Sequence, residues 1–203
     1  MTSTTSNPFD TGYYNEDELR SYGFKSVGKN VKIAKNCTII GLENIELADN
    51  VRIDGYCSLM AGGSGFIRIG SYVHIGAYSF LAAGEGIVME DFSGLSQGVR
   101  IYSRTDDYNG NALSNPTVPA KYTGVTGGTV TLRRHALIGS SVIILPKVEV
   151  GIGSAVGAMS LVTKSLKEWG FFFGVPAKFL KARSQKLLEL EKELLAEVAS
   201  SSE

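Results

Sequence analysis

The chain has 203 residues, with 20 basic and 20 acidic side chains and a formal net charge of zero. Because positive charge is not in excess, we expect neither nucleic acid nor a membrane surface as a partner. The N-terminal stretch MTSTTSNPFDTGYY lacks the apolar segment of a signal peptide, and no apolar run approaches the length of a membrane span. The composition therefore predicts a soluble, cytoplasmic protein with one main domain.

The first recognisable element is NEDELRSYGF, residues 15–24. Asn15 is a good N-cap, acidic residues fill the first turn, and Gly23 marks the end of a short helix. We expect this helix to belong to an N-terminal helical cap, residues 1–26, that covers the first repeat of the following domain.

An aliphatic residue then returns at every sixth position along residues 27–168. A helix repeats at about 3.6 residues and a strand at 2, so this period belongs to neither. Six triples carry it: Val27, Ile33, Ile39; Leu47, Ile53, Leu59; Ile69, Ile75, Leu81; Met89, Leu95, Ile101; Leu132, Ile138, Ile144; and Val150, Val156, Val162. Each triple is typical of one triangular coil with three short strands. The sequence predicts an all-β solenoid, a parallel β-helix of about six coils.

Two cysteines, Cys37 and Cys57, occupy the same position in consecutive coils. Their spacing matches no metal site, and we interpret them as thiols of the core. Stacked neighbours of this kind are close enough that spacing alone does not exclude a disulfide.

The six-residue period is interrupted once, between Ile101 and Val130, where a long loop over residues 102–129 leaves the coil stack. Long ordered loops in compact proteins are often functional, so we expect this loop to form part of a site. Its tyrosines, Tyr102, Tyr108 and Tyr122, are candidates for stacking on a sugar or a base, or for packing the loop itself.

Residues 169–203 form the C-terminal segment, with a helix expected from about 177 to 199. Its leucines, Leu187, Leu190, Leu194 and Leu195, form an apolar stripe. This stripe fits either an interface or packing against the coil stack.

The segments LIGSSVIILPKVEVGIGSAVGAMSLVTKSL and GVPAKFLK resemble motifs of the hexapeptide-repeat acyltransferases, over about residues 24–184. The resemblance implies a left-handed β-helix, although general chirality rules favour right-handed crossovers. It also implies a homotrimer with active sites between subunits, acetyl-CoA as acyl donor, a sugar acceptor beneath the long loop, and no metal.

Position by position, the same resemblance implies a set of contacts to acetyl-CoA. These are Leu137 and Ser140 on the pantetheine arm, Ala158, Thr163 and Lys164 on its far end and the nucleotide, and Lys178, Lys181 and Arg183 on the phosphates. Basic side chains suit phosphates, but the four charges also fit a solvated face.

Acyl transfer from a thioester needs a base for the acceptor and a donor for the oxyanion. Galactoside and maltose O-acetyltransferases of this fold use a loop histidine, where this chain has Asp106. We expect His74 to be the general base and regard His135 as the second candidate, with both near one corner of the prism. Asp106 or Asp107 would orient the base or bind the amine.

We expect the acceptor to be an amine, because an ammonium needs less assistance to lose its proton than a hydroxyl. HIGAY, YSRTDDYNG and RSQKLLELE are similar to segments of dTDP-4-amino-4,6-dideoxyglucose N-acetyltransferases of O-antigen pathways. The sugar nucleotide would contact Tyr102, Arg104, Asp107, Tyr108 and Tyr122. Its amine would attack the thioester directly, with the backbone N–H of Ser140 or Gly157 facing the oxyanion.

Two alternatives remain. A sugar O-acetyltransferase, acting on a galactoside, maltose or a polysaccharide, would share the fold. A non-catalytic β-helix scaffold is the other, and a zinc hydratase is disfavoured because two histidines cannot supply three ligands.

Overall fold

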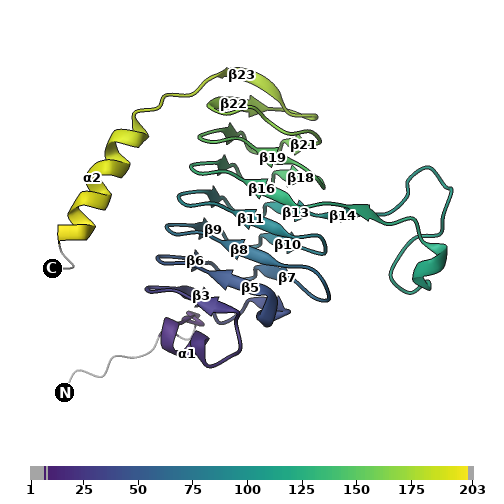
Figure 1. Cartoon of the computed structure of the whole chain (residues 1–203), viewed down its shortest axis with the longest axis horizontal. Helices are drawn as coiled ribbons and strands as arrows, with labels where there is room; N and C mark the ends of the chain where they lie inside the picture. The colour runs from purple at the N-terminus through teal and green to yellow at the C-terminus, as the bar shows by residue number, and fades with distance from the viewer. Residues whose placement is uncertain (1–6, 8, 201–203) are drawn as a thin grey trace.

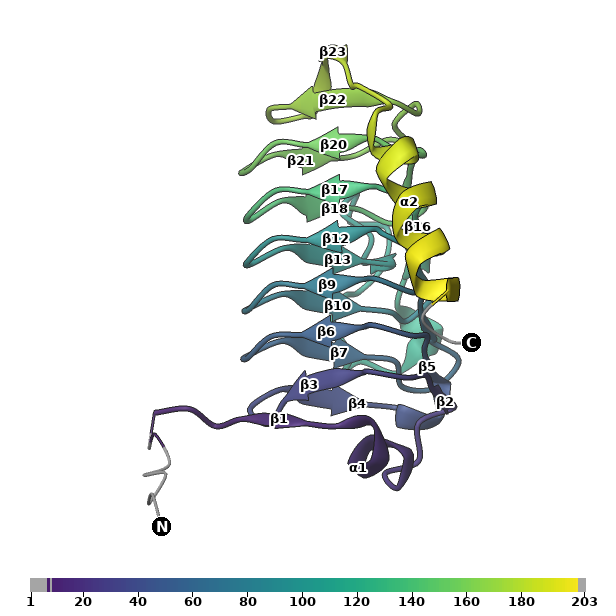
Figure 2. The same ribbon diagram turned by 90° about the vertical axis from the view of Figure 1, so that its left-hand side faces the viewer.

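A computed structural model describes residue 7 and residues 9–200. The expected cap 1–26 and the end of the expected segment 169–203 therefore lie partly outside the described residues. The described chain winds into a triangular solenoid with an arm on one side and a helix along another (Figures 1 and 2). The expected β-helix is confirmed.

Three parallel sheets form the sides of the prism, and we call them sheets A, B and C. Sheet A contains β3 (Lys32–Ala34), β6 (Arg52–Ile53), β9 (His74–Ile75), β12 (Gly94–Leu95), β17 (Leu137–Ile138), β20 (Ala155–Val156) and β22 (Gly170–Phe173). Sheet B contains β2 (Ser26–Val27), β5 (Ile45–Leu47), β8 (Ile67–Ile69), β11 (Ile87–Met89), β16 (Val130–Leu132) and β19 (Glu149–Val150). Sheet C contains β4 (Thr38–Ile40), β7 (Ser58–Met60), β10 (Phe80–Ala82), β13 (Arg100–Tyr102), β18 (Ile143–Ile144) and β21 (Leu161–Val162).

The six predicted triples coincide with the six complete turns, one member in each sheet. Their side chains point into the prism, and Ile53, Ile75 and Ile138 of sheet A are completely buried. Burying such a side chain contributes roughly 1.5–3 kcal/mol, so the stacked aliphatic residues dominate the stability of the solenoid. Above them, Leu166 bridges to Val150 and β22 joins sheet A, which adds a partial seventh turn.

Antiparallel strands cover both ends of the parallel stack of sheet A, so that β3 and β22 are not edge strands. β1 (Tyr13–Tyr14) pairs with β3 at the bottom, and β23 (Lys178–Ala182) pairs with β22 at the top. The expectation of a helix from residue 177 is wrong over this stretch. Residues 178–182 bond to the free edge of β22, and the helix begins only at α2 (Leu187–Ser200).

The N-terminal helix is shorter than expected, α1 (Glu16–Arg20), but its start is as predicted. Asn15 accepts a hydrogen bond from the Glu18 N–H, and the Glu18 side chain accepts one from the Asn15 N–H. This capping box satisfies free donors at the start of the helix.

Residues with positive φ occur at all three corners, and at two of them they include bulky side chains in successive turns. At the corner between sheets B and A these include Asn50, Tyr72, Phe92 and His135. Bulky side chains rarely adopt this conformation. Here the rings of Tyr72 and Phe92 stack at 4.7 Å, and Phe92 and His135 stack at 5.2 Å, which helps to offset the strain.

Both cysteines are free thiols in adjacent turns, with Cys57 buried and Cys37 half-buried. Each Sγ donates to a carbonyl oxygen of the next turn, at 3.2 Å for Cys37 and 3.3 Å for Cys57. They are part of the core, as expected.

Candidate functional site

A vertical strip of side chains runs up the outer face of sheet A. The strand register places His74, Gly94, Leu137, Ala155, Phe171 and Lys181 in one column. Gly94 has open space outside it, since a Cβ there would meet only the His74 carbonyl oxygen, at 3.6 Å. At the spacing of parallel strands the strip is roughly 24 Å long. It leads from an imidazole, across apolar surface, to a basic residue at the top.

His74 is held by a carboxylate at the base of this strip. Its Nε2 lies 2.8 Å from Asp54 Oδ2, while Asp54 Oδ1 accepts from Arg52 Nε at 2.7 Å and from the Tyr13 hydroxyl at 2.9 Å. Partial burial would raise the pKa of Asp54, but the hydrogen bonds from His74, Arg52 and Tyr13 outweigh it and lower that pKa. In the neutral imidazole, the Asp54 carboxylate favours the tautomer with its proton on Nε2, which leaves the lone pair on Nδ1. A base oriented by a third group in this way is typical of catalytic histidines.

His135 lies in a different environment and is only 8% exposed. It aligns with Tyr72 and Phe92 at the B/A corner, and its Nε2 is 2.7 Å from Glu191 Oε2 of α2. These contacts enclose the ring between the coil stack and the helix. In the single chain His135 is therefore much less accessible than His74, and its catalytic candidacy stays a prediction.

The long loop forms an arm on a two-stranded stalk, β14 (Arg104–Thr105) and β15 (Thr126–Gly127), which pair antiparallel. Asp106 follows the stalk and lines a cavity of about 600 Å³ within the arm. The residues lining this cavity are Arg104, Thr105, Asp106, Asn115, Pro116, Val118, Pro119, Ala120, Thr123 and Val125. The arm also contains the short 3₁₀ helix η2 (Ala120–Tyr122).

Asp107 organises the arm from within. Its carboxylate accepts hydrogen bonds from the N–H groups of Asn109 at 2.8 Å, Asn111 at 2.7 Å and Ala112 at 3.1 Å. These bonds, first those from Asn109 and Asn111, lower the pKa of Asp107. Its oxygens thus hold the loop together, and the expected contact with the acceptor stays a prediction.

The other expected acceptor residues are dispersed. Arg104 Nε is paired with Glu85 at 2.8 Å, and the Tyr102 ring packs against Phe80 on the outside of sheet C. Tyr108 is 92% exposed at the arm, and Tyr122 lies under the Lys121 ammonium. Only Arg104 and Asp106 of the expected acceptor and catalytic residues line the arm cavity.

The expected donor residues divide into two groups. Leu137 and Lys181 lie in the strip, Lys178 is on the same top strand β23, and Ser140 and Ala158 border the strip at the corner between sheets A and C. Thr163 and Lys164 instead follow β21, at the far end of sheet C.

Arg183 is already engaged. Its Nη1 donates to the carbonyl oxygens of Gly153 at 2.8 Å and His135 at 3.0 Å, and burial lowers its pKa. This guanidinium fastens the C-terminal segment to the B/A corner, and the phosphate contact expected from the resemblance stays a prediction.

Gly157 also departs from expectation. Its N–H donates to the Phe172 carbonyl at 2.8 Å within the sheet. Within the described part of the chain, the Ser140 N–H has no such acceptor. Of the two expected oxyanion donors, only Ser140 has a free N–H.

Asp54 is the site residue that the sequence analysis missed. The sequence contains the spacing that identifies it. Asp54 precedes His74 by 20 residues, which is about one turn of the solenoid, and follows Arg52 by two residues on the same edge. The repeat period predicts such neighbours once the coil register is known.

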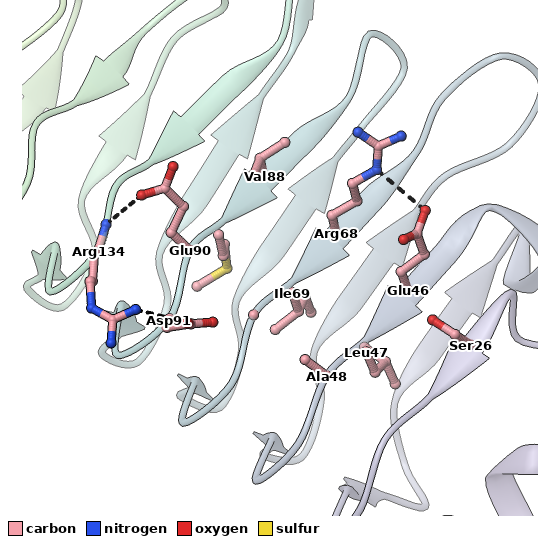
Figure 3. Close-up of a pocket in the computed structure, with 12 residues that line it drawn as sticks. Ser26, Glu46, Leu47, Ala48, Arg68, Ile69, Val88, Glu90, Asp91 and Arg134 are labelled. Atoms are coloured by element: carbon pink, nitrogen blue, oxygen red, sulfur yellow. Dashed lines mark hydrogen bonds and ion pairs between the residues drawn. The ribbon is translucent and has the colours of Figure 1, made fainter. Parts of the chain in front are cut away.

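A second concave surface lies on the outside of sheet B, a groove of about 410 Å³. Figure 3 shows Arg68 bonded to Glu46 at one side and Arg134 bonded to Asp91 and Glu90 at the other. These charges satisfy one another, and the groove contains none of the expected site residues.

The arm and the strip do not meet in one chain. Figure 1 shows the arm projecting at mid-height of the solenoid, after β13 of sheet C, and Figure 2 shows sheet A on the opposite side of the solenoid. Asp106 and His74 therefore lie on different sides of a single subunit. Among the described residues there is no cluster of three metal-ligating side chains and no helix able to cross a membrane.

Comparison with known proteins gives consistent relatives, although no protein-family model matches the chain. The chain is 42% identical over 179 residues to a dTDP-4-amino-4,6-dideoxy-D-glucose acyltransferase of Escherichia coli, covering 88% of this chain and 93% of the relative. It superimposes with a TM-score of 0.88 and 44% identity on AntD, an N-acyltransferase from Bacillus cereus in complex with dTDP and 3-hydroxybutyryl-CoA, covering 93% and 99% of the two chains. A serine-to-cysteine variant of AntD with dTDP-4-amino-4,6-dideoxyglucose and coenzyme A gives 0.87 and 45%, covering 92% and 98%. The sequence, the left-handed solenoid and these relatives agree that the chain belongs to the hexapeptide-repeat acyltransferase family.

Proposed function

We propose that this protein transfers the acyl group of acetyl-CoA to the 4-amino group of a dTDP-linked 4-amino-4,6-dideoxy sugar, for O-antigen or other surface polysaccharide synthesis in the cytoplasm. The main support for the proposal is the strip on sheet A. It runs from the imidazole of His74, which Asp54 orients, across apolar surface to the basic residue Lys181. The similarity to an acyltransferase named for this sugar supports the same substrate class.

The donor fits the strip from Lys181 down to Gly94. Lys178 and Lys181 are exposed on β23, where ammonium groups suit the phosphates of coenzyme A. Leu137 offers apolar surface, and Gly94 leaves room for the thioester beside His74. Since AntD binds 3-hydroxybutyryl-CoA, longer acyl groups deserve comparison with acetyl.

A homotrimer would bring the arm of one subunit to the strip of the next. The outer face of sheet C supports this assembly because it is more apolar than the outer face of sheet B, although it includes Arg100. Sheet C presents Thr38, Ile40, Ser58, Met60, Phe80, Ala82, Arg100, Tyr102, Ile143 and Leu161; sheet B presents Ser26, Glu46, Arg68, Val88, Thr131 and Glu149. An exposed apolar face of this kind is typical of a subunit interface.

Two AntD variants point to Asp106. They replace a serine and an aspartate that lie ten residues apart in that chain. In the present sequence, Ser96 and Asp106 are the one serine and aspartate with that order and separation. The match supports a role for Asp106 in the reaction and adds Ser96 to the candidate site.

The mechanism follows from these positions. Asp106 of one subunit would hold the sugar ammonium, and His74 Nδ1 of the neighbour would take its proton. The amine lone pair then attacks the thioester carbonyl, so that a C–N bond forms. The Ser140 N–H would stabilise the oxyanion. When the C–S bond breaks, the attacking nitrogen gives up its second proton, and the coenzyme A thiolate takes up that proton and leaves as the thiol.

The test is release of coenzyme A thiol from acetyl-CoA across matched acceptors. The panel contains dTDP-4-amino-4,6-dideoxyglucose, dTDP-glucose, a galactoside and maltose, with 3-hydroxybutyryl-CoA as a second donor. Turnover with the amino sugar alone, and a product heavier by one acyl group, supports N-acyl transfer. Turnover with a plain hydroxyl sugar would replace the proposal with sugar O-acylation, and no turnover would favour a non-catalytic scaffold.

A further inference from the structure

Two thiols that the proposed reaction does not use lie beside each other in the first two turns of the solenoid. Cys37 and Cys57 directly precede β4 and β7, which pair in parallel with Thr38 opposite Ser58. The Thr38 N–H donates to the Cys57 carbonyl oxygen at 2.9 Å, which fixes the two cysteines as neighbours. At the spacing of adjacent strands, about 4.8 Å, their Cα atoms lie within the range of roughly 4.4–6.8 Å that a disulfide requires.

The two thiols differ in their access to solvent. Cys57 is 1% exposed, whereas Cys37 is half-buried and lines a cavity of about 330 Å³ beside α1 and the first turn. Tyr14, Tyr22 and Lys35 line the same cavity, and Lys35 gives it a positive charge. Reactive cysteines sit in such electropositive, partly exposed surroundings, whereas buried ones are inert. A small oxidant therefore reaches Cys37 before Cys57.

The contact between the two thiols also separates them chemically. In the resting protein each Sγ donates to a carbonyl oxygen, Cys37 to that of Asp54 and Cys57 to that of Gly76. A hydrogen bond from the Cys57 thiol lowers the pKa of Cys37, and this outweighs the effect of burial. The same contact, together with burial, raises the pKa of Cys57. Because the thiolate is the nucleophile, Cys37 is the sulfur that attacks, and Cys57 stays protonated beside it.

We infer that Cys37 and Cys57 form a peroxide-sensitive pair, in which hydrogen peroxide converts the two thiols into a disulfide that joins the first two turns. The Cys37 thiolate attacks one peroxide oxygen, the O–O bond breaks, and the leaving hydroxide takes up the proton that Cys37 released. Cys37 is then a sulfenic acid, which condenses with a neighbouring thiol. The Cys57 sulfur attacks the Cys37 sulfur, the S–O bond breaks, and the hydroxyl group leaves with the Cys57 proton as a second water. The two sulfurs together lose two electrons, which reduce the peroxide.

This pair is separate from the strip on sheet A. Cys57 belongs to the buried core, whereas His74 and Leu137 are exposed on the outer face of the sheet. Free thiols that close into a disulfide only on oxidation are typical of redox-sensing pairs in reducing compartments. The inference therefore holds or fails independently of the acyl transfer proposed above.

The test is a titration of the reduced, full-length protein with hydrogen peroxide, after the reductant has been removed. Trypsin cleaves after Lys35, Arg52 and Arg68, so Cys37 lies in peptide 36–52 and Cys57 in peptide 53–68. The remaining thiols are blocked with iodoacetamide in denaturant before digestion, and mass spectrometry then identifies each peptide. Cys37→Ser and Cys57→Ser are the matched variants, and thermal unfolding checks that both are folded. If a variant does not fold, the wild-type peptide map alone decides.

The expected result for wild type is loss of both thiols together and a disulfide between peptides 36–52 and 53–68, which dithiothreitol reverses. The Cys57→Ser variant should form a sulfenic acid at Cys37 that dimedone traps, and the Cys37→Ser variant should lose no thiol at the same peroxide concentration. Wild-type thiols that stay unreacted overturn the inference, and so does oxidation of Cys37 without a joined peptide pair. A disulfide between two chains, detected by non-reducing electrophoresis, or equal sensitivity of the two folded variants would also overturn it.

Discussion

Glu191 of α2 and His135 of the coil stack are joined by a hydrogen bond of 2.7 Å between Oε2 and Nε2. The same carboxylate pairs with Arg134. α2 has no buried residue, and Leu190, Leu194 and Leu195 remain exposed along it. Polar contacts at Glu191, rather than the leucine stripe, therefore hold this helix beside the solenoid.

Replacement of Glu191 by alanine is expected to release α2. Hydrogen bonds to charged groups contribute roughly 1.5–3 kcal/mol each, and their loss leaves His135 Nε2 without its carboxylate while Arg134 keeps only Asp91. Hydrogen exchange of residues 187–200 should become fast, while exchange of β17 stays slow. Glu189→Ala, an exposed residue of the same helix, is the control. If exchange in α2 is the same in both variants, Glu191 does not hold the helix.

His74→Ala should lower kcat by about 10²–10⁴, the usual contribution of a general base, with little change in the KM for acetyl-CoA. Steady-state kinetics with the amino sugar nucleotide measures both constants. Asp54→Asn should lower kcat less, because the imidazole loses its orientation but is still present. A fully active His74→Ala enzyme would leave Asp106 as the proton acceptor.

Asp54 also makes a prediction about acid stability. Its pKa is lowered in the folded protein by His74, Arg52 and Tyr13, against the effect of burial. A carboxyl with a depressed folded pKa stabilises the protein above its unfolded pKa of about 4, and that stability is lost as the pH falls further. Urea unfolding should therefore find Asp54→Asn less stable than wild type at pH 7, with the difference shrinking below pH 4. A difference that is constant with pH would mean that ionisation of Asp54 does not contribute.

Asp107→Ala should loosen the arm without unfolding the solenoid. The substitution removes two carboxylate oxygens that accept three hydrogen bonds from backbone N–H groups, and such local bonds hold turns in place. Limited proteolysis should cut within residues 106–125 faster than in wild type, while the thermal midpoint changes little. Asp107→Asn keeps one acceptor oxygen and should be intermediate. Equal cleavage in all three proteins would contradict this role.

The coil register could be predicted from the sequence because the hexad repeat is local and each inward position is aliphatic. Ile75 and Leu95 stack where their spacing placed them. The strand at residues 178–182 could not be predicted, since KFLKA has good helix formers and only the free edge of β22 makes it a strand.

The candidate site was predicted less completely than the fold, because its partners are far apart in the chain. The contact that encloses His135 comes from Glu191, 56 residues later in the chain. Arg183 likewise bonds to carbonyls 30 and 48 residues earlier. By contrast, most of the strip from His74 to Lys181 can be predicted from the repeat, because it consists of equivalent positions in successive turns. Only its members on β22 and β23 lie beyond the repeat.

The most direct measurement of the central claim, acyl transfer to a sugar amine at a site shared by two subunits, uses mixed trimers. Asp106→Asn and His74→Ala proteins, each inactive alone, are unfolded together, refolded in equal amounts and assayed with acetyl-CoA and dTDP-4-amino-4,6-dideoxyglucose. If each site takes His74 from one subunit and Asp106 from its neighbour, random assembly restores about one quarter of wild-type activity. Activity that stays at the level of the separate variants would contradict a shared site.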